Sequence, residues 1–154
     1  NLLMKYFIGA DHAGIEIKAF VKDLFEQRGH EVEDLGPYNK DRVDYPDFAA
    51  KVCKKVLENS GSMGILICGS GIGMSMAANK FDGIRAALCH NEYSARMARK
   101  HNDANVICLG ERVSGEGMIE AIIKAWDKAE FEEGRHTQRV EKINSLSKIG
   151  SCRA

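Results

Sequence analysis

The chain has 154 residues, enough for one domain of ordinary size with a buried core. Its 22 basic residues balance 22 acidic ones, so no broad charge favours binding to nucleic acid or to an anionic membrane. No apolar run approaches the roughly 20 residues of a membrane span, and no signal-peptide pattern is present. We expect a single domain over residues 4–150, with residues 1–3 as an addition ahead of a start at Met4.

Short apolar runs alternate with longer segments of helical periodicity along the chain. The runs that predict strands are, in chain order, 6–9, 31–35, 64–68, 85–89 and 106–109. The segments that predict helices are 15–28, 47–59, 74–80, 92–101, 117–129 and about 137–148. This alternation predicts an α/β fold: a three-layer α/β/α sandwich built on a Rossmann-like, five-stranded parallel sheet.

Ligands of such sheets bind beyond the carboxyl ends of the strands. Glycine and polar residues dominate the segments that follow the predicted strands, which are 10–14, 36–38, 69–73, 90–91 and 110–112. We therefore expect the functional site to be built from these segments.

The most informative segment is Cys68–Gly73, where a buried strand leads into a glycine-rich loop that begins a helix. Glycines let the backbone approach a ligand closely, and the free N–H groups of a helix start favour a phosphate or a reaction oxyanion. The alternative is a tight turn around a buried cysteine. Common phosphate loops do not match, because Met74 stands where a dinucleotide fingerprint needs glycine and a cysteine phosphatase needs arginine.

Four further groups are candidates for chemistry, and each has a plainer explanation. Asp11 and His12 could supply a base and a switchable cation, although both residue types are common in turns. His101 and Asn102 end a predicted helix, where histidine also compensates the helix dipole. The remaining candidates are Arg112, which follows a strand, and the helical pair Arg135 and Arg139, which could bind one phosphate or form a solvated face.

The cysteines give no sign of a disulfide framework or of a metal site. Their number is odd and no two have CxxC spacing, the five being Cys53, Cys68, Cys89, Cys108 and Cys152. No His/Cys/Asp/Glu group has the spacing of a metal site. We expect a reduced, cytoplasmic protein without a metal or cofactor.

Taken together, the motifs resemble the type B ribose-5-phosphate isomerase family, which also contains galactose-6-phosphate and allose-6-phosphate isomerases. The resemblance extends from Met4 to about Lys148. The segments that carry it are Gly9–Gly14, Asp44–Pro46, Ile67–Gly73, Ala77–Lys80, Gly83–Ala86, His101–Val106 and Gly134–His136 with Arg139. Some family members place a glutamate base where Met74 stands here, so this chain resembles the branch that uses a cysteine.

The resemblance implies metal-free isomerisation of a sugar phosphate through a cis-enediol. It also implies a homodimer, or a tetramer, in which the second subunit completes each active site. Cys68 would be the base that moves a proton between C1 and C2, while Asp11 and His101 would open the furanose ring. The residues implied to hold the substrate are Ser70, Gly69, Gly71, Gly73 and Asn102 for the oxyanion, His12, Arg112, Arg135 and Arg139 for the phosphate, and Tyr45 for the sugar.

The expected reaction is the interconversion of D-ribose 5-phosphate and D-ribulose 5-phosphate. Allose 6-phosphate or galactose 6-phosphate remain alternative substrates, because the length of the pocket decides between them. A non-catalytic protein that binds phosphosugars is the alternative from another class, although binding alone needs no thiol base such as Cys68.

Overall fold

The computed structural model describes residues 2–150, with side chains described to residue 147. Its sheet is parallel throughout and has the order β2-β1-β3-β5-β4. The strands are β1 (Lys5–Ala10), β2 (Glu31–Asp34), β3 (Met63–Cys68), β4 (Ala86–Leu88) and β5 (Val106–Gly110). The prediction of a five-stranded parallel sheet is confirmed.

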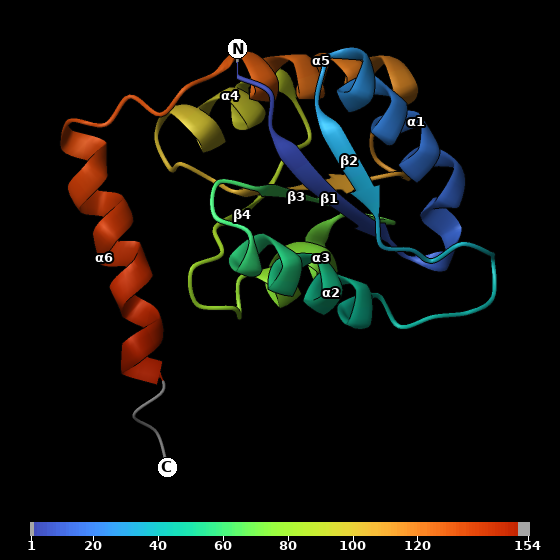
Figure 1. Ribbon diagram of the computed structural model, residues 1–154, viewed down its shortest axis with the longest axis horizontal. Coiled ribbons are helices and arrows are strands. Elements are labelled where there is room, and N and C mark those ends of the chain that lie inside the picture. The colour runs from blue at the N-terminus through green and yellow to red at the C-terminus, as the bar shows by residue number, and fades with distance from the viewer. Residues whose placement is uncertain (1, 151–154) are drawn as a thin grey trace.

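Helices cover both faces of the sheet (Figure 1), which confirms the three-layer arrangement. One face carries α1 (Ile15–Gln27), α4 (Glu92–Lys100) and α5 (Glu116–Lys128), and the other carries α2 (Tyr45–Glu58) and α3 (Ile72–Ala78). A short 3-10 turn, η1 (His12–Gly14), precedes α1. The last helix, α6 (Arg135–Gly150), stands beside this body rather than in either layer.

The central strand β3 shows why its sequence is apolar without interruption. Ile65 and Ile67 pack into the core below α1, α4 and α5, whereas Leu66 and Cys68 pack into the core beside α2 and α3. Successive side chains of a strand point to opposite faces, and here both faces are covered. The Cys68 side chain therefore belongs to the α2/α3 face at the carboxyl end of the strand.

Several element boundaries differ from the sequence predictions. Helix α3 begins at Ile72 rather than at residue 74, because Gly71 caps it with a positive φ of 81°. Helix α6 begins at Arg135 instead of Thr137, directly after Gly134 with φ 56°. Strand β4 is shorter than residues 85–89, since the Arg85 amide instead bonds to the side chain of Asn105.

The order of the strands places a topological switch point between β1 and β3. Strand β1 pairs with β2 on one side and with β3 on the other. The chain therefore forms β2 on one side of β1 and then crosses to the other side to form β3. Asp11 follows β1 and Cys68 ends β3, so the two residues flank the crevice in which such sheets bind ligands.

No helix within residues 2–150 combines the length and the apolar character of a membrane span.

Candidate active site

Cys68 lies beneath the start of a helix. Its side chain is largely buried, with 6% of the residue exposed, and its Sγ accepts a hydrogen bond from the Gly71 amide at 3.2 Å. The next amide, that of Ile72, donates to the Ser70 hydroxyl at 3.2 Å. The first amides of an α-helix have no acceptor within the helix, and here the Gly71 and Ile72 amides bond to the Cys68 sulfur and to the Ser70 hydroxyl instead.

Three glycines permit the close contacts that shape this loop. A Cβ atom on Gly71 would meet the Leu88 side chain at 2.6 Å, and one on Gly73 would meet the Tyr45 ring at 2.5 Å. A Cβ atom on Gly110 would lie 2.5 Å from the carbonyl oxygen of Ser70. The loop thus rests directly on the end of β5, with the Tyr45 ring against Gly73.

Asp11 and His12 are held by backbone contacts beside the loop. The Asp11 amide donates to the Ile67 carbonyl at 3.0 Å, and its side chain accepts from the Ala13 amide at 3.1 Å. The ring of His12 accepts the Val43 amide at Nδ1, at 3.2 Å. Both residues are therefore fixed at the carboxyl edge, next to Cys68.

The segment that supports His12 is itself tied down by a buried lysine. Lys18 is 2% exposed, and its ammonium group lies 2.7 Å from Asp34 Oδ1 and donates to the Pro37 carbonyl. Asp34 also accepts the Gly36 amide at 2.8 Å. This ion pair fixes the start of the loop that leads to Val43 and Tyr45.

Arg112 completes the first group of predicted site residues. Its amide donates to the Gly69 carbonyl at 2.9 Å, and a Cβ atom on Gly69 would lie 3.5–3.8 Å from the Arg112 side chain. The residues gathered at this edge, called the thiol half-site below, are Asp11, His12, Tyr45, Cys68, Gly69, Ser70, Gly71, Gly73 and Arg112.

The other predicted residues lie at the opposite edge of the sheet. Helix α4 starts at the carboxyl end of β4 and runs back, so His101 and Asn102 precede the amino end of β5. The five residues of β5 separate the two edges by about 13 Å. Arg135 and Arg139, on α6, lie on this side as well, because His136 between them stacks on His101 with ring centroids 4.2 Å apart. These four residues, His101, Asn102, Arg135 and Arg139, form the histidine half-site.

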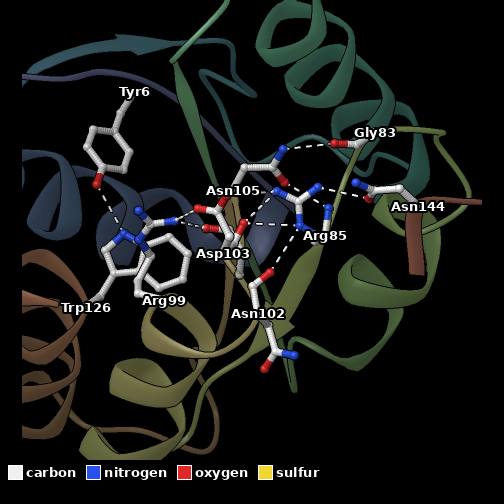
Figure 2. Close-up of polar contacts among 10 residues, drawn as sticks. Tyr6, Gly83, Arg85, Arg99, Asn102, Asp103, Asn105, Trp126 and Asn144 are labelled. Carbon is white, nitrogen blue, oxygen red and sulfur yellow. Dashed lines mark hydrogen bonds and ion pairs between the residues drawn. The ribbon is translucent and has the colours of Figure 1, made fainter. Parts of the chain in front are cut away.

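A polar network holds the backbone of the histidine half-site (Figure 2). Arg85 donates to the carbonyls of Asn102 at 3.1 Å and Asp103 at 2.7 Å, and it reaches Asn144 of α6 at 3.0 Å. Arg99 donates to Asp103 Oδ1 at 3.1 Å. Arg85 binds only the backbone of Asn102, and the side-chain amide points away from the network.

His101, Glu132 and His136 are the residues most closely grouped for a metal ion within the described chain. Their ligand atoms lie within 4.8 Å of one another, and Glu132 Oε1 is 3.5 Å from Nε2 of each histidine. However, the two rings are stacked with an interplanar angle of 11°. A ligand nitrogen binds a metal in the plane of its ring, and two nearly parallel planes do not meet at one ion. The arrangement fits hydrogen bonding to a shared carboxylate better than it fits a metal centre.

Burial lowers the pKa of His136, and the neighbouring His101 and Arg135 lower it further.

Two residues beside the thiol half-site, His90 and Glu111, lie in the segments expected to build the site but were not assigned a role from the sequence. His90 Nε2 lies 3.1 Å from the Ser70 carbonyl and supports the loop. The Glu111 side chain lies against Gly14. A Cβ atom added to Gly14 would be 3.2 Å from Glu111 Oε2 and 3.3 Å from Asp11 Oδ1. Both residues follow strands of the sheet, and this position in the sequence was the feature that could have indicated a role in the site.

The comparisons with known sequences agree with this geometry. A sequence model of the family described as Ribose/Galactose Isomerase matches residues 6–143. Ribose-5-phosphate isomerase B of Escherichia coli is 44% identical over 144 residues, which cover 94% of this chain and 97% of that protein. D-erythrulose-4-phosphate isomerase of Pectobacterium atrosepticum is 45% identical over 143 residues, covering 92% and 93%.

Solved structures with the same fold carry similar names. Ribose-5-phosphate isomerase B of Clostridium thermocellum has a TM-score of 0.92 and 50% identity, over 96% of this chain and 99% of that one. Ribose-5-phosphate isomerase B of Mycoplasma genitalium, solved with bound ribulose 5-phosphate, has a TM-score of 0.91 and 41% identity, over 96% and 99%.

Proposed function

Because the chain belongs to the ribose/galactose isomerase family, we propose that it interconverts D-ribose 5-phosphate and D-ribulose 5-phosphate. The observation that carries this proposal is the placement of Cys68 under the amide-lined loop, beside Asp11 at the switch point of the sheet. A base next to preorganised N–H donors is what proton abstraction from a carbon beside a carbonyl requires.

The reaction has two parts. In ring opening, the O1 hydroxyl loses its proton, the bond between C1 and the ring oxygen breaks, and the ring oxygen gains a proton; Asp11 and His101 exchange these protons. The Cys68 thiolate then removes the C2 proton, and the electron pair moves to the C1 carbonyl oxygen. The amides of the Gly69–Gly73 loop and Asn102 stabilise this enediolate oxygen. Return of the proton to C1, with transfer of the O2 proton to O1, gives the ketose.

Arginines suited to a phosphate are present in both half-sites. Arg112 lies in the thiol half-site, and Arg135 and Arg139 lie four residues apart on α6, where both can face one ligand. Within residues 2–147, none of the three forms an ion pair with a carboxylate. Their charges are therefore available for an anionic ligand, together with His12.

The proposed enzyme is a homodimer in which each pocket takes the thiol half-site from one subunit and the histidine half-site from the other. The support is that each end of the strands carries only part of the machinery, and the length of β5, about 13 Å, lies between the two ends. A cytoplasmic location is proposed as well, since the four cysteines of the described chain are free and buried.

The test is formation of ribulose 5-phosphate from ribose 5-phosphate by the purified protein, measured with and without excess chelator. We expect turnover that the chelator does not change. Absence of ribulose 5-phosphate in both arms would contradict the proposal.

A second candidate reaction follows from one of the relatives, which is named a D-erythrulose-4-phosphate isomerase. The values of kcat/KM for four-, five- and six-carbon aldose phosphates decide the substrate. We expect ribose 5-phosphate to have the highest value. Preference for erythrose 4-phosphate, allose 6-phosphate or galactose 6-phosphate would reassign the substrate and leave the reaction class unchanged.

A further inference from the structure

Glu111 brings a second carboxyl group to Asp11. It is the first residue after β5, and its amide donates to the Cys68 carbonyl at 3.0 Å. Its side chain reaches towards η1, where Gly14 approaches both carboxyl groups closely. A Cβ atom on Gly14 would lie 3.2 Å from Glu111 Oε2 and 3.3 Å from Asp11 Oδ1. Two carboxyl groups thus share one small space at the carboxyl edge of the sheet.

The surroundings of Glu111 indicate that it carries a proton. Its Oε1 atom is buried and has no hydrogen-bond partner among the described residues, which an ionised carboxylate tolerates poorly. Burial raises the pKa of Glu111 and the nearby Asp11 raises it further, while Arg112 and His12 act in the opposite direction. Two neighbouring carboxyl groups do not both ionise readily, so this arrangement favours the protonated form of Glu111.

We propose that Glu111 is a positioning residue for ring opening: its protonated carboxyl donates a hydrogen bond to Asp11 and orients the Asp11 carboxylate towards the sugar. This inference rests on the proposed function, in which Asp11 takes part in opening the furanose ring. Asp11 Oδ1 already accepts the Ala13 amide, so a second donor from Glu111 would restrict the remaining rotation of the carboxylate. No atom of Glu111 is transferred to the substrate.

The decisive comparison separates ring opening from proton abstraction. Ribulose 5-phosphate has no free C5 hydroxyl with which to close a ring, so exchange of solvent deuterium into its C1 position reports on proton abstraction without ring opening. Isomerisation of ribose 5-phosphate requires ring opening as well. Glu111→Leu removes the donor at similar volume, whereas Glu111→Gln keeps an N–H donor that does not ionise. Glu120→Leu, at an exposed position of α5, is the matched control.

We expect Glu111→Leu to lower kcat/KM for ribose 5-phosphate about ten-fold, as the loss of one hydrogen bond would, with deuterium exchange within about two-fold of wild type. Glu111→Gln should keep most of the activity. It should also retain activity at higher pH relative to wild type, because the wild-type donor is lost when Glu111 ionises in the presence of Asp11, His12 and Arg112.

Two results would overturn the inference. Equal loss of exchange and isomerisation in Glu111→Leu would make the Glu111 side chain a structural support of the whole thiol half-site rather than of Asp11 alone. Failure of Glu111→Gln to restore activity would remove the hydrogen-bond donor as the cause. If the wild-type protein isomerised no aldose phosphate, the proposed function itself would fail, and that outcome is visible before any variant is compared.

Discussion

The four cysteines of the described chain lie in different surroundings. Burial raises the pKa of Cys53 and of Cys89 to about 12, and it raises the pKa of Cys108 well above its usual value. These three thiols keep their protons at neutral pH. Cys68 is the one at the end of a strand with a backbone N–H donated to its sulfur. Its position in the fold, more than its residue type, suits it for chemistry.

Replacement of Cys68 by alanine should therefore lower kcat for isomerisation by 10²–10⁴-fold, roughly the contribution of a positioned base, with little change in KM. Cys53→Ala, at a buried position of α2, is the matched control and should keep kcat. Steady-state kinetics on ribose 5-phosphate measure both variants. Near-normal turnover by Cys68→Ala would reject this base.

The raised pKa of Glu111 also predicts a change in stability with pH. The folded protein holds the Glu111 proton more tightly than the unfolded chain does. Its free energy of unfolding should therefore fall as pH rises from the ordinary glutamate value through the raised one. Glu111→Gln removes this loss, so the variant should gain stability relative to wild type as pH increases. Urea unfolding between about pH 4 and pH 8 measures the difference, and a difference independent of pH would refute the prediction.

At the scale of elements, the start of α3 depends on a glycine conformation. Gly71 combines φ 81° with a neighbouring Leu88 side chain that would lie 2.6 Å from a Cβ atom. We expect Gly71→Ala to lower the free energy of unfolding by about 1–3 kcal/mol and to lower kcat, because the loop amides must shift. Gly117→Ala, inside α5 with open space around it, should instead be neutral or stabilising by up to about 1 kcal/mol. Equal urea midpoints for the two variants would contradict this account.

The loop before α2 depends on the buried ion pair between Lys18 and Asp34. Lys18→Met removes the hydrogen bonds of the ammonium group and leaves the partly exposed Asp34 carboxylate without its cation, so we expect a loss of about 1–3 kcal/mol in the free energy of unfolding. The double variant Lys18→Met/Asp34→Leu should recover part of that loss, because no unpaired charge remains. Denaturant unfolding of the wild type, the two single variants and the double variant gives the coupling energy between Lys18 and Asp34. If the losses of the two single variants simply add in the double variant, the two residues do not act as a pair.

The existence of most elements could be predicted from sequence periodicity, because buried strands such as 64–68 end at glycine or polar residues. Their arrangement could not. The order of the strands depends on packing between segments far apart in the chain, and only that order shows that β1 and β3 are neighbours, which brings Asp11 beside Cys68. Glu111 was missed for a similar reason. An acidic residue after a strand is typical of a solvated loop, and its contact with Gly14 exists only in the folded chain.

At the scale of the whole molecule, the two half-sites allow a direct test of a shared active site. Cys68→Ala and Arg139→Ala should each be inactive at low substrate concentration. In a mixed dimer, one pocket would carry both substitutions and the other neither. Unfolding and refolding the two variants together should therefore restore about a quarter of the wild-type activity, as random pairing gives. The control consists of the two variants refolded separately and then assayed. Absence of recovered activity after co-refolding would place both half-sites in one subunit.

The hydrogen bond from Val43 to Nδ1 of His12 fixes the tautomer of that ring. With Nδ1 occupied as an acceptor, an uncharged His12 carries its hydrogen on Nε2, the nitrogen left for other contacts. The uncharged imidazole can consequently donate to a phosphate oxygen through Nε2. Recognition of the anion by this ring thus depends on a backbone amide, and not solely on a positive charge.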